Sequence, residues 1–132
     1  MATLNTTLTL SSTDATSDTL SITLVDSLTV GAPIQGLSQI IADNTGANNI
    51  VVPATGGTIT YFFCRHTGTT DGSTATTQLV DVEETGDAAF ARLGPGEWMF
   101  LPFCHHAGNV GVQFQVTESS NVLMEYAFWS KA

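Results

Sequence analysis

Two short stretches gather the residue types that most often carry chemistry. Cys64-Arg65-His66 and Cys104-His105-His106 hold both cysteines and all three histidines of the chain. Imidazole and thiolate are ligands of tetrahedral zinc sites, so these stretches would suit zinc if they met in the fold. The spacing argues against such a site, because neighbours on a strand point to opposite faces. We therefore expect no metal site and no cofactor, with the histidine rings hydrogen-bonded to loops at strand ends.

The same residues do not form a recognisable catalytic arrangement. A cysteine nucleophile needs a positioned histidine, and the histidines nearest to Cys64 and Cys104 diverge from them on a strand. The G-x-S-x-G turn of serine hydrolases is absent. We expect no catalytic residues and no enzymatic activity. Two states of the cysteines are open. They are either two buried thiols or, in an oxidising medium, a Cys64–Cys104 disulfide.

Acidic residues form the other candidate group. Asp81 and Glu83 would share one face of a strand, with Glu84 beside them. Such a pair is expected on a solvated surface, because a chain this short offers little room for a glycosidase cleft. The stretch Asp71-Gly72-Ser73 starts like a calcium-binding loop but lacks the acidic residue that closes one.

The elements that must position these residues are predicted by alternation. Leu20, Ile22 and Leu24 fall on even positions, as do Val112 and Phe114, and a period of two is typical of strands with one buried face. Turn clusters recur between the strands, which favours a sandwich or barrel. The fold class is thus predicted as all-β: a single antiparallel β-sandwich, jelly-roll-like, with one weak helical turn in Gly36–Asp43. The expected strands are Thr3–Leu10, Thr19–Val25, Leu28–Val30, Ile50–Val52, Thr58–His66, Thr77–Glu83, Ala88–Leu93, Glu97–Phe103, Val110–Thr117 and Val122–Trp129.

The domain organisation is simple at 132 residues. Residues 19–132 are predicted to form the β-sandwich domain. Residues 1–18, rich in Thr and Ser, are either an N-terminal arm that pairs with a neighbouring subunit or the first strand of the core. In Thr58–His66 both faces are heavily apolar, which predicts either a central strand or a strand with one face against another subunit.

Charge excludes several partners. The chain has 12 acidic and 3 basic residues and a net charge of −9, so the basic clusters that bind nucleic acid or anionic membranes are missing. A partner with basic patches is expected instead. The first residues, from Met1 to Asn5, lack the basic and apolar regions of a signal peptide. We expect synthesis in a host cytoplasm.

One stretch resembles part of an enzyme family. Gly96-Glu97-Trp98-Met99-Phe100-Leu101-Pro102 is similar to the start of the second cupin motif, with Glu97 in place of the usual aspartate. Cys104 stands where a glycine is expected and Ala107 where the metal-binding histidine is expected. The first cupin motif, with its paired histidines and glutamate, is absent. The resemblance implies a shared jelly-roll hairpin, and a cupin-like metal-dependent enzyme stays an alternative.

A second resemblance covers more of the chain. Residues 92–102 place a Pro-Gly-Glu turn between two apolar strands, and Thr-rich strands fill the N-terminal third. The chain resembles small virion proteins of tailed bacteriophages, especially capsid decoration (cement) proteins. Soluble β proteins often carry lysine on their edge strands, which prevents pairing with other chains. Lys131 is the single lysine of this chain. Its edge strands are therefore expected to be covered by partners.

The resemblance implies a function and a location. The expected protein is a non-enzymatic structural protein on the capsid surface of the virion, binding between subunits of the major capsid protein and stabilising the head. It is expected to form a homotrimer. A phage tail or fibre component is the nearest alternative. A carbohydrate-binding module that uses Trp98 or Trp129 as a sugar platform is the alternative from another class.

Overall fold

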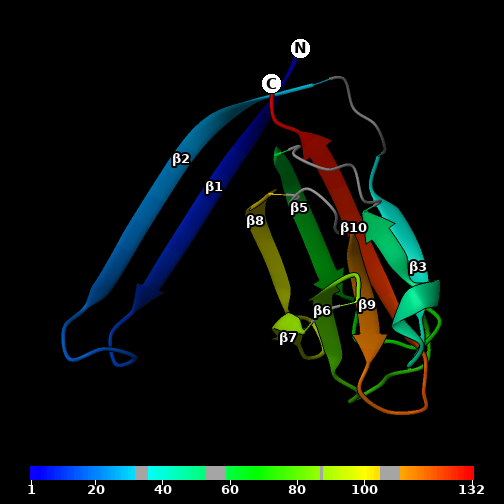
Figure 1. The fold of residues 1–132 in the computed structure, drawn as a ribbon. Helices are drawn as coiled ribbons and strands as arrows, with labels where there is room; N and C mark the ends of the chain where they lie inside the picture. Colours follow the sequence, from blue (N-terminus) through cyan, green and yellow to red (C-terminus); the bar gives the residue numbers. More distant parts are fainter. Residues whose placement is uncertain (32–35, 53–58, 87, 105–110) are drawn as a thin grey trace.

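A computed structural model describes residues 1–31, 36–52, 59–86, 88–104 and 111–132 (Figure 1). In these ranges the chain is all-β, apart from a short 3-10 turn over Gly46–Asn48. No helix in the described part of the chain is long and apolar enough to cross a membrane. The strands are β1 (Ala2–Ser12), β2 (Leu20–Val30), β3 (Ser38–Ala42), β4 (Ile50–Val52), β5 (Ile59–His66), β6 (Val80–Glu84), β7 (Ala89–Leu93), β8 (Trp98–Cys104), β9 (Val112–Val116) and β10 (Val122–Ser130).

Strand order confirms the predicted fold class. Eight strands form two four-stranded sheets, ordered β3-β10-β5-β8 and β4-β9-β6-β7, and β1 and β2 form a separate two-stranded sheet. Every pairing is antiparallel. The first strand of the body pairs with the last, the second with the next to last, and so on inward to β6 and β7. This nested pairing is the topology of a jelly roll.

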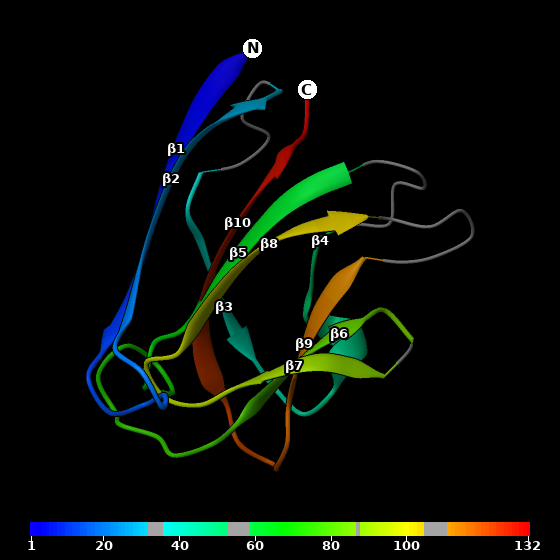
Figure 2. The ribbon, with the colours of Figure 1, turned by 90° about the vertical axis from the view of Figure 1, so that its left-hand side faces the viewer.

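The molecule has three layers in Figure 2: the β1-β2 hairpin, the β3-β10-β5-β8 sheet, and the β4-β9-β6-β7 sheet. The hydrophobic core lies between the two four-stranded sheets and is formed by alternate residues of both. Phe62 and Met124 come from one sheet, and Val82 and Phe114 from the other, each with no exposed surface. No hairpin residue belongs to this core cluster, so the jelly-roll body carries a core of its own.

The helical turn predicted for Gly36–Asp43 is wrong, because Ser38–Ala42 forms strand β3 instead. The strand pairs with β10 from Ala42 opposite Val122 to Ser38 opposite Tyr126. This pairing buries Ala42 and leaves Ile41 exposed, which is the alternation of an edge strand. Tertiary pairing therefore decides the conformation of a segment whose local pattern is weak.

The first thirty residues fold back on themselves. β1 pairs with β2 of the same chain over its whole length, from Ala2 opposite Val30 to Ser12 opposite Leu20. β2 thus lies with β1 and outside both four-stranded sheets. The root of the hairpin is fixed to the body, because the backbone N–H of Gly31 donates to the carbonyl of Ser130 at 2.8 Å. Figure 1 shows the hairpin diverging from the body toward its tip.

Candidate functional site

The hairpin is amphipathic because its two strands alternate in step. Leu8 lies opposite Leu24, and residues directly opposite in an antiparallel pair share one face. Even-numbered residues therefore make one apolar face, whereas the odd-numbered face is mostly Thr and Ser, with Val25 as its apolar exception. We call this surface the leucine face, and its leucine and isoleucine members are Leu4, Leu8, Leu10, Leu20, Ile22, Leu24 and Leu28.

The outer surface of the β3-β10-β5-β8 sheet is unusually aromatic. Phe62 and Cys64 of β5 point into the core, so their neighbours Tyr61 and Phe63 point outward, toward the hairpin. Sandwich strands normally present polar residues on this side. The rings of Tyr61 and Phe100 stack there, with centroids 6.0 Å apart and planes 10° apart. We call this surface the aromatic face, and its members are Tyr61, Phe63, Trp98, Phe100 and Trp129.

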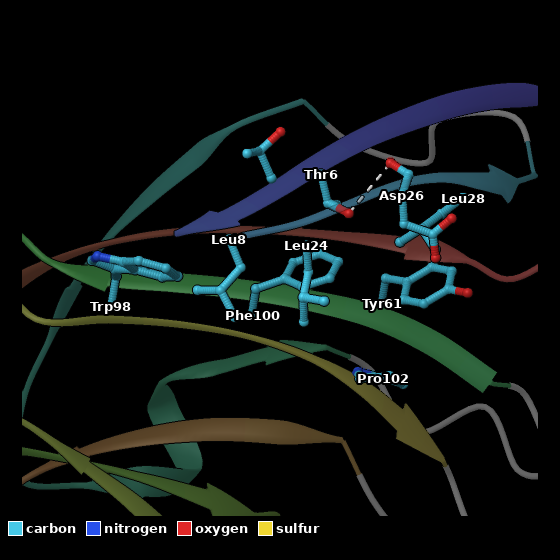
Figure 3. Close-up of a pocket in the computed structure, with 10 residues that line it drawn as sticks. Thr6, Leu8, Leu24, Asp26, Leu28, Tyr61, Trp98, Phe100 and Pro102 are labelled. Carbon is cyan, nitrogen blue, oxygen red and sulfur yellow. Dashed lines mark hydrogen bonds between the residues drawn. The ribbon is translucent and has the colours of Figure 1, made fainter. Parts of the chain in front are cut away.

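An open groove of about 590 Å³ separates the leucine face from the aromatic face. This volume lies within the ~300–1,000 Å³ range of ordinary ligand sites. Figure 3 shows Leu8 and Leu24 reaching in from the hairpin, with Trp98 and Phe100 on the sheet opposite them. The groove is thus lined by two apolar surfaces that belong to one chain.

The groove is covered at the root of the hairpin and open toward its tip. Tyr61 near the root is 6% exposed, whereas Leu24 is 60% exposed and Trp98 is 53% exposed. Large apolar side chains on both walls therefore stand in solvent. Contiguous exposed apolar surface of this kind is typical of an interaction site.

Asp26 is the one charged residue among those described as lining the groove. It lies opposite Thr6 in the hairpin register, so both side chains share the leucine face. The Thr6 hydroxyl donates to the backbone carbonyl of Asp26 at 3.4 Å, and the backbone N–H of Ser27 donates to Oδ1 of Asp26 at 2.7 Å. The groove therefore combines apolar walls with a single carboxylate.

The thiol of Cys64 is structural. It is a free cysteine with no exposed surface, and burial raises its pKa to about 12, which keeps it protonated and unreactive. A Cys64–Cys104 disulfide is excluded by the register, because Cys64 lies opposite Met99 whereas Cys104 lies opposite Ile59. Five residues along a strand separate the two positions by about 16 Å, far beyond the ~7 Å limit between bridged Cα atoms.

The prediction of a loop-bonded histidine ring is confirmed for His66. The buried ring accepts a hydrogen bond at Nδ1 from the backbone N–H of Gly68 and donates one from Nε2 to the carbonyl of Gln78, both at 2.9 Å. One nitrogen accepts and the other donates, as in a neutral imidazole. The ring thus fastens the end of β5 to the following loop. His105 and His106 lie outside the described residues.

The acidic candidates are also held by structural partners. Asp81 and Glu83 share one face of β6, as predicted. Arg92 donates to both carboxylate oxygens of Asp81 at 2.5 and 2.9 Å, and the amide of Gln113 donates to Glu83 at 2.9 Å. Asp71 accepts hydrogen bonds from the backbone N–H groups of its own loop. Each carboxylate is therefore engaged in stabilising a turn or a strand pair.

The stretch that resembles a cupin motif forms a turn followed by β8. The carboxylate of Glu97 accepts a hydrogen bond from the backbone N–H of Gly94 at 2.6 Å, which tightens the turn. No group of three His, Cys, Asp or Glu residues suited to a metal occurs in the part of the chain that the structure describes. Ala107 lies outside that part.

The groove itself was not predicted from the sequence. Alternation indicated apolar faces near Leu24 and Tyr61, and the sequence predicted for Trp98 a place in a jelly-roll hairpin or a sugar platform. Nothing in the local pattern indicated that Leu8, Asp26 and Phe100 would face one another across a shared space. The useful signal was the predicted strand Thr58–His66, which has aromatic residues on both faces. One face can pack in the core, so the other face had to be covered by another segment or another chain.

Comparison with known proteins adds no relative. No family model, curated protein or solved structure matches the chain.

Proposed function

We propose that the protein is a non-enzymatic structural protein of a phage particle, namely a capsid decoration protein that stabilises the head by binding between major capsid subunits. The observation that carries this proposal is the projecting hairpin, whose leucine face is exposed at Leu8, Leu10, Ile22 and Leu24. Burying such a face against a partner gives affinity without chemistry.

The body of the molecule supports the same proposal. Jelly rolls occur in viral capsid proteins as well as in lectins and cupins, so the fold is compatible with a role in the virion and does not by itself select one. The core of the body does not depend on the hairpin, which leaves the hairpin available for contacts outside the chain.

A homotrimer remains part of the proposal. Apart from contacts of Thr29 and Val30 with the C-terminal residues at the root, the strands of the hairpin pair with each other in the described chain, so each keeps an open edge along most of its length. Open strand edges suit repeated contacts in a cyclic oligomer, where each subunit offers the same surface, and contacts through these edges leave the leucine face for the capsid partner. Sedimentation equilibrium tests this directly, and a strictly monomeric protein at all concentrations would remove the trimer from the proposal.

Two neighbouring residues provide a matched test of the hairpin. Leu24 is 60% exposed on the leucine face, and Val25 is 73% exposed on the opposite face. Leu24→Ser is expected to weaken attachment to capsid shells at least about tenfold, because burying one leucine contributes roughly 1.5–3 kcal/mol. Val25→Ser makes a similar change on the other face and should leave attachment nearly unchanged.

The shells for this assay are assembled from the major capsid protein whose gene lies nearest to that of this chain, and binding is followed by co-sedimentation. Equal losses for the two variants would mean that the leucine face is not the contact. Absence of any wild-type binding to head shells, with binding to tail preparations, would replace the decoration role by a tail or fibre role.

A carbohydrate-binding role is the second candidate, favoured by one observation. Trp98 is 53% exposed beside Phe100, and an exposed ring next to a groove can serve as a stacking platform for a sugar. Trp129 is half-buried in the sheet that faces the hairpin, so its ring is less accessible to a sugar than that of Trp98. A glycan array separates the roles, because specific binding that Trp98→Ala abolishes would favour the carbohydrate module.

A further inference from the structure

We infer that the groove receives an arginine or lysine side chain carried on an extended segment of the partner, with Asp26 binding the cationic end and the aromatic face packing against the stem. This inference rests on the proposed function for the identity of the partner. The groove chemistry that it invokes stands on the described residues alone.

Charge complementarity selects a cationic occupant. The described lining of the groove holds one carboxylate, that of Asp26, and no basic residue. Across the chain, 12 acidic residues face 3 basic ones. Two of the basic residues already have acidic partners, since Arg92 pairs with Asp81 and Arg65 lies 3.7 Å from Glu125. The surplus of negative charge draws positively charged groups toward the surface and disfavours a second copy of the same acidic chain.

The aromatic face suits the rest of such a side chain. The aliphatic stem of lysine or arginine packs on apolar surface while its head group stays near water. Aromatic rings also attract cations by about 0.5–1 kcal/mol at exposed sites and by about 2 kcal/mol when water is excluded. Figure 3 shows Tyr61 opposite the Asp26 end of the groove, Phe100 opposite Leu24, and Trp98 at the other end, next to Leu8. Because Tyr61 is 6% exposed, the rings available to the stem of such a side chain are those toward the open end of the groove, Phe100 and Trp98.

The hairpin register defines the pattern that the partner segment must carry. Asp26 and Leu24 are two residues apart on β2, so their side chains lie about 7 Å apart on the same face. A strand laid along the hairpin presents its own alternate side chains at the same spacing. The matching pattern is a basic residue and an apolar residue separated by one position. Asp26 then binds the basic residue while Leu24 contacts the apolar one.

Two synthetic peptides test this pattern. One alternates threonine and valine around a central arginine, and its twin has glutamate in place of the arginine. Binding to the full chain is followed by NMR chemical shifts of the Trp98 indole and the Asp26 backbone amide. The arginine peptide is expected to bind at least about tenfold more tightly than its twin, which corresponds to about 1.4 kcal/mol.

A pair of variants assigns the effect to the groove. Asp26→Asn is expected to remove most of the difference between the peptides. Asp14→Asn changes the net charge equally at the tip of the hairpin, outside the groove lining, and should keep the difference. Both positions are exposed, and the NMR spectrum of each variant reports whether the fold is retained.

The outcomes separate this inference from the proposed function. Equal affinity for both peptides, no peptide binding, or equal effects of the two variants would overturn the inference that the groove binds a cationic side chain. Capsid attachment that still depends on Leu24 would then leave the proposed function standing. Charge-selective peptide binding without capsid attachment would support the inference that the groove binds a cation and would count against the capsid decoration role. Self-association that Asp26→Asn abolishes would identify a second copy as the occupant and overturn the inference.

Discussion

Phe62 of β5 and Phe114 of β9 meet across the interior of the jelly roll, with ring centroids 6.3 Å apart and planes inclined by 38°. Neither residue has exposed surface. Phe114 also contacts the ring of Tyr126 from β10 edge to face, with centroids 6.3 Å apart. These rings connect the two four-stranded sheets at the centre of the core, so they determine whether the sheets stay together.

Replacing Phe114 should test this role. Phe114→Ala is expected to lower the free energy of unfolding by about 3–5 kcal/mol, because it removes buried apolar surface and leaves a cavity between the sheets. Chemical denaturation measures the loss. Ile41→Ala, at a position on β3 that is 53% exposed, is the control and should cost far less. Similar losses for both variants would mean that the sheets are not joined through these rings.

The hairpin is expected to be dispensable for folding but required for attachment. Deletion of residues 2–28 should leave a cooperatively unfolding body, because the core cluster contains no hairpin residue. The same deletion should abolish binding to capsid shells. Circular dichroism, thermal unfolding and co-sedimentation measure the three properties. A truncated chain that fails to fold would make the hairpin part of the core.

Deletion of residues 2–18 alone should behave differently. It removes β1 and leaves β2 with both edges and its apolar side chains uncovered. Such an edge favours association with other chains. Light scattering should therefore detect more aggregation of this shorter deletion than of the deletion of residues 2–28, which uncovers the aromatic face but leaves no unpaired β2.

The loop around Asp71 is expected to show a specific dependence on pH. Backbone N–H groups of Thr74 and Ser73 donate to this carboxylate and lower its pKa from 3.8 to about 2. The charged form is thus favoured by the folded state. The resulting stabilisation is present above pH about 3.9, the unfolded value, and is lost as pH falls through about 2.

Carbon-13 NMR of the Asp71 side chain measures this pKa directly. Titration near 3.8 would contradict the loop geometry. Asp71→Asn keeps an acceptor oxygen but cannot titrate, so it should remove this contribution to the pH dependence of unfolding between pH about 4 and 2.

Cys64 is expected to resist modification in the folded protein. Its thiol is buried and its pKa is raised to about 12 by burial, so very little thiolate exists at pH about 8. Iodoacetamide should label Cys64 only after denaturation, and peptide mapping without reductant should find no Cys64–Cys104 bridge. Rapid labelling of the native protein would contradict this burial.

Local pattern predicted most strands of this protein, because a period of two needs no knowledge of distant partners. Ile50–Val52 was predicted with its observed bounds, and Thr58–His66 differs from β5 by one residue. Jelly-roll character, a structural role for His66 and the shared face of Asp81 and Glu83 also followed from the sequence. Each depends on strand periodicity or on the chemistry of one side chain.

Other features depended on contacts that only the tertiary structure creates. Ser38–Ala42 becomes a strand through pairing with β10, not through its own propensity. Leu24 and Trp98 are 74 positions apart in the chain, yet both line one groove, because a backbone hydrogen bond from Gly31 to Ser130 fixes the root of the hairpin beside the sheet. Which face of an amphipathic strand meets the core, a neighbour or solvent is set by packing between distant segments, and alternation alone carries no information about that choice.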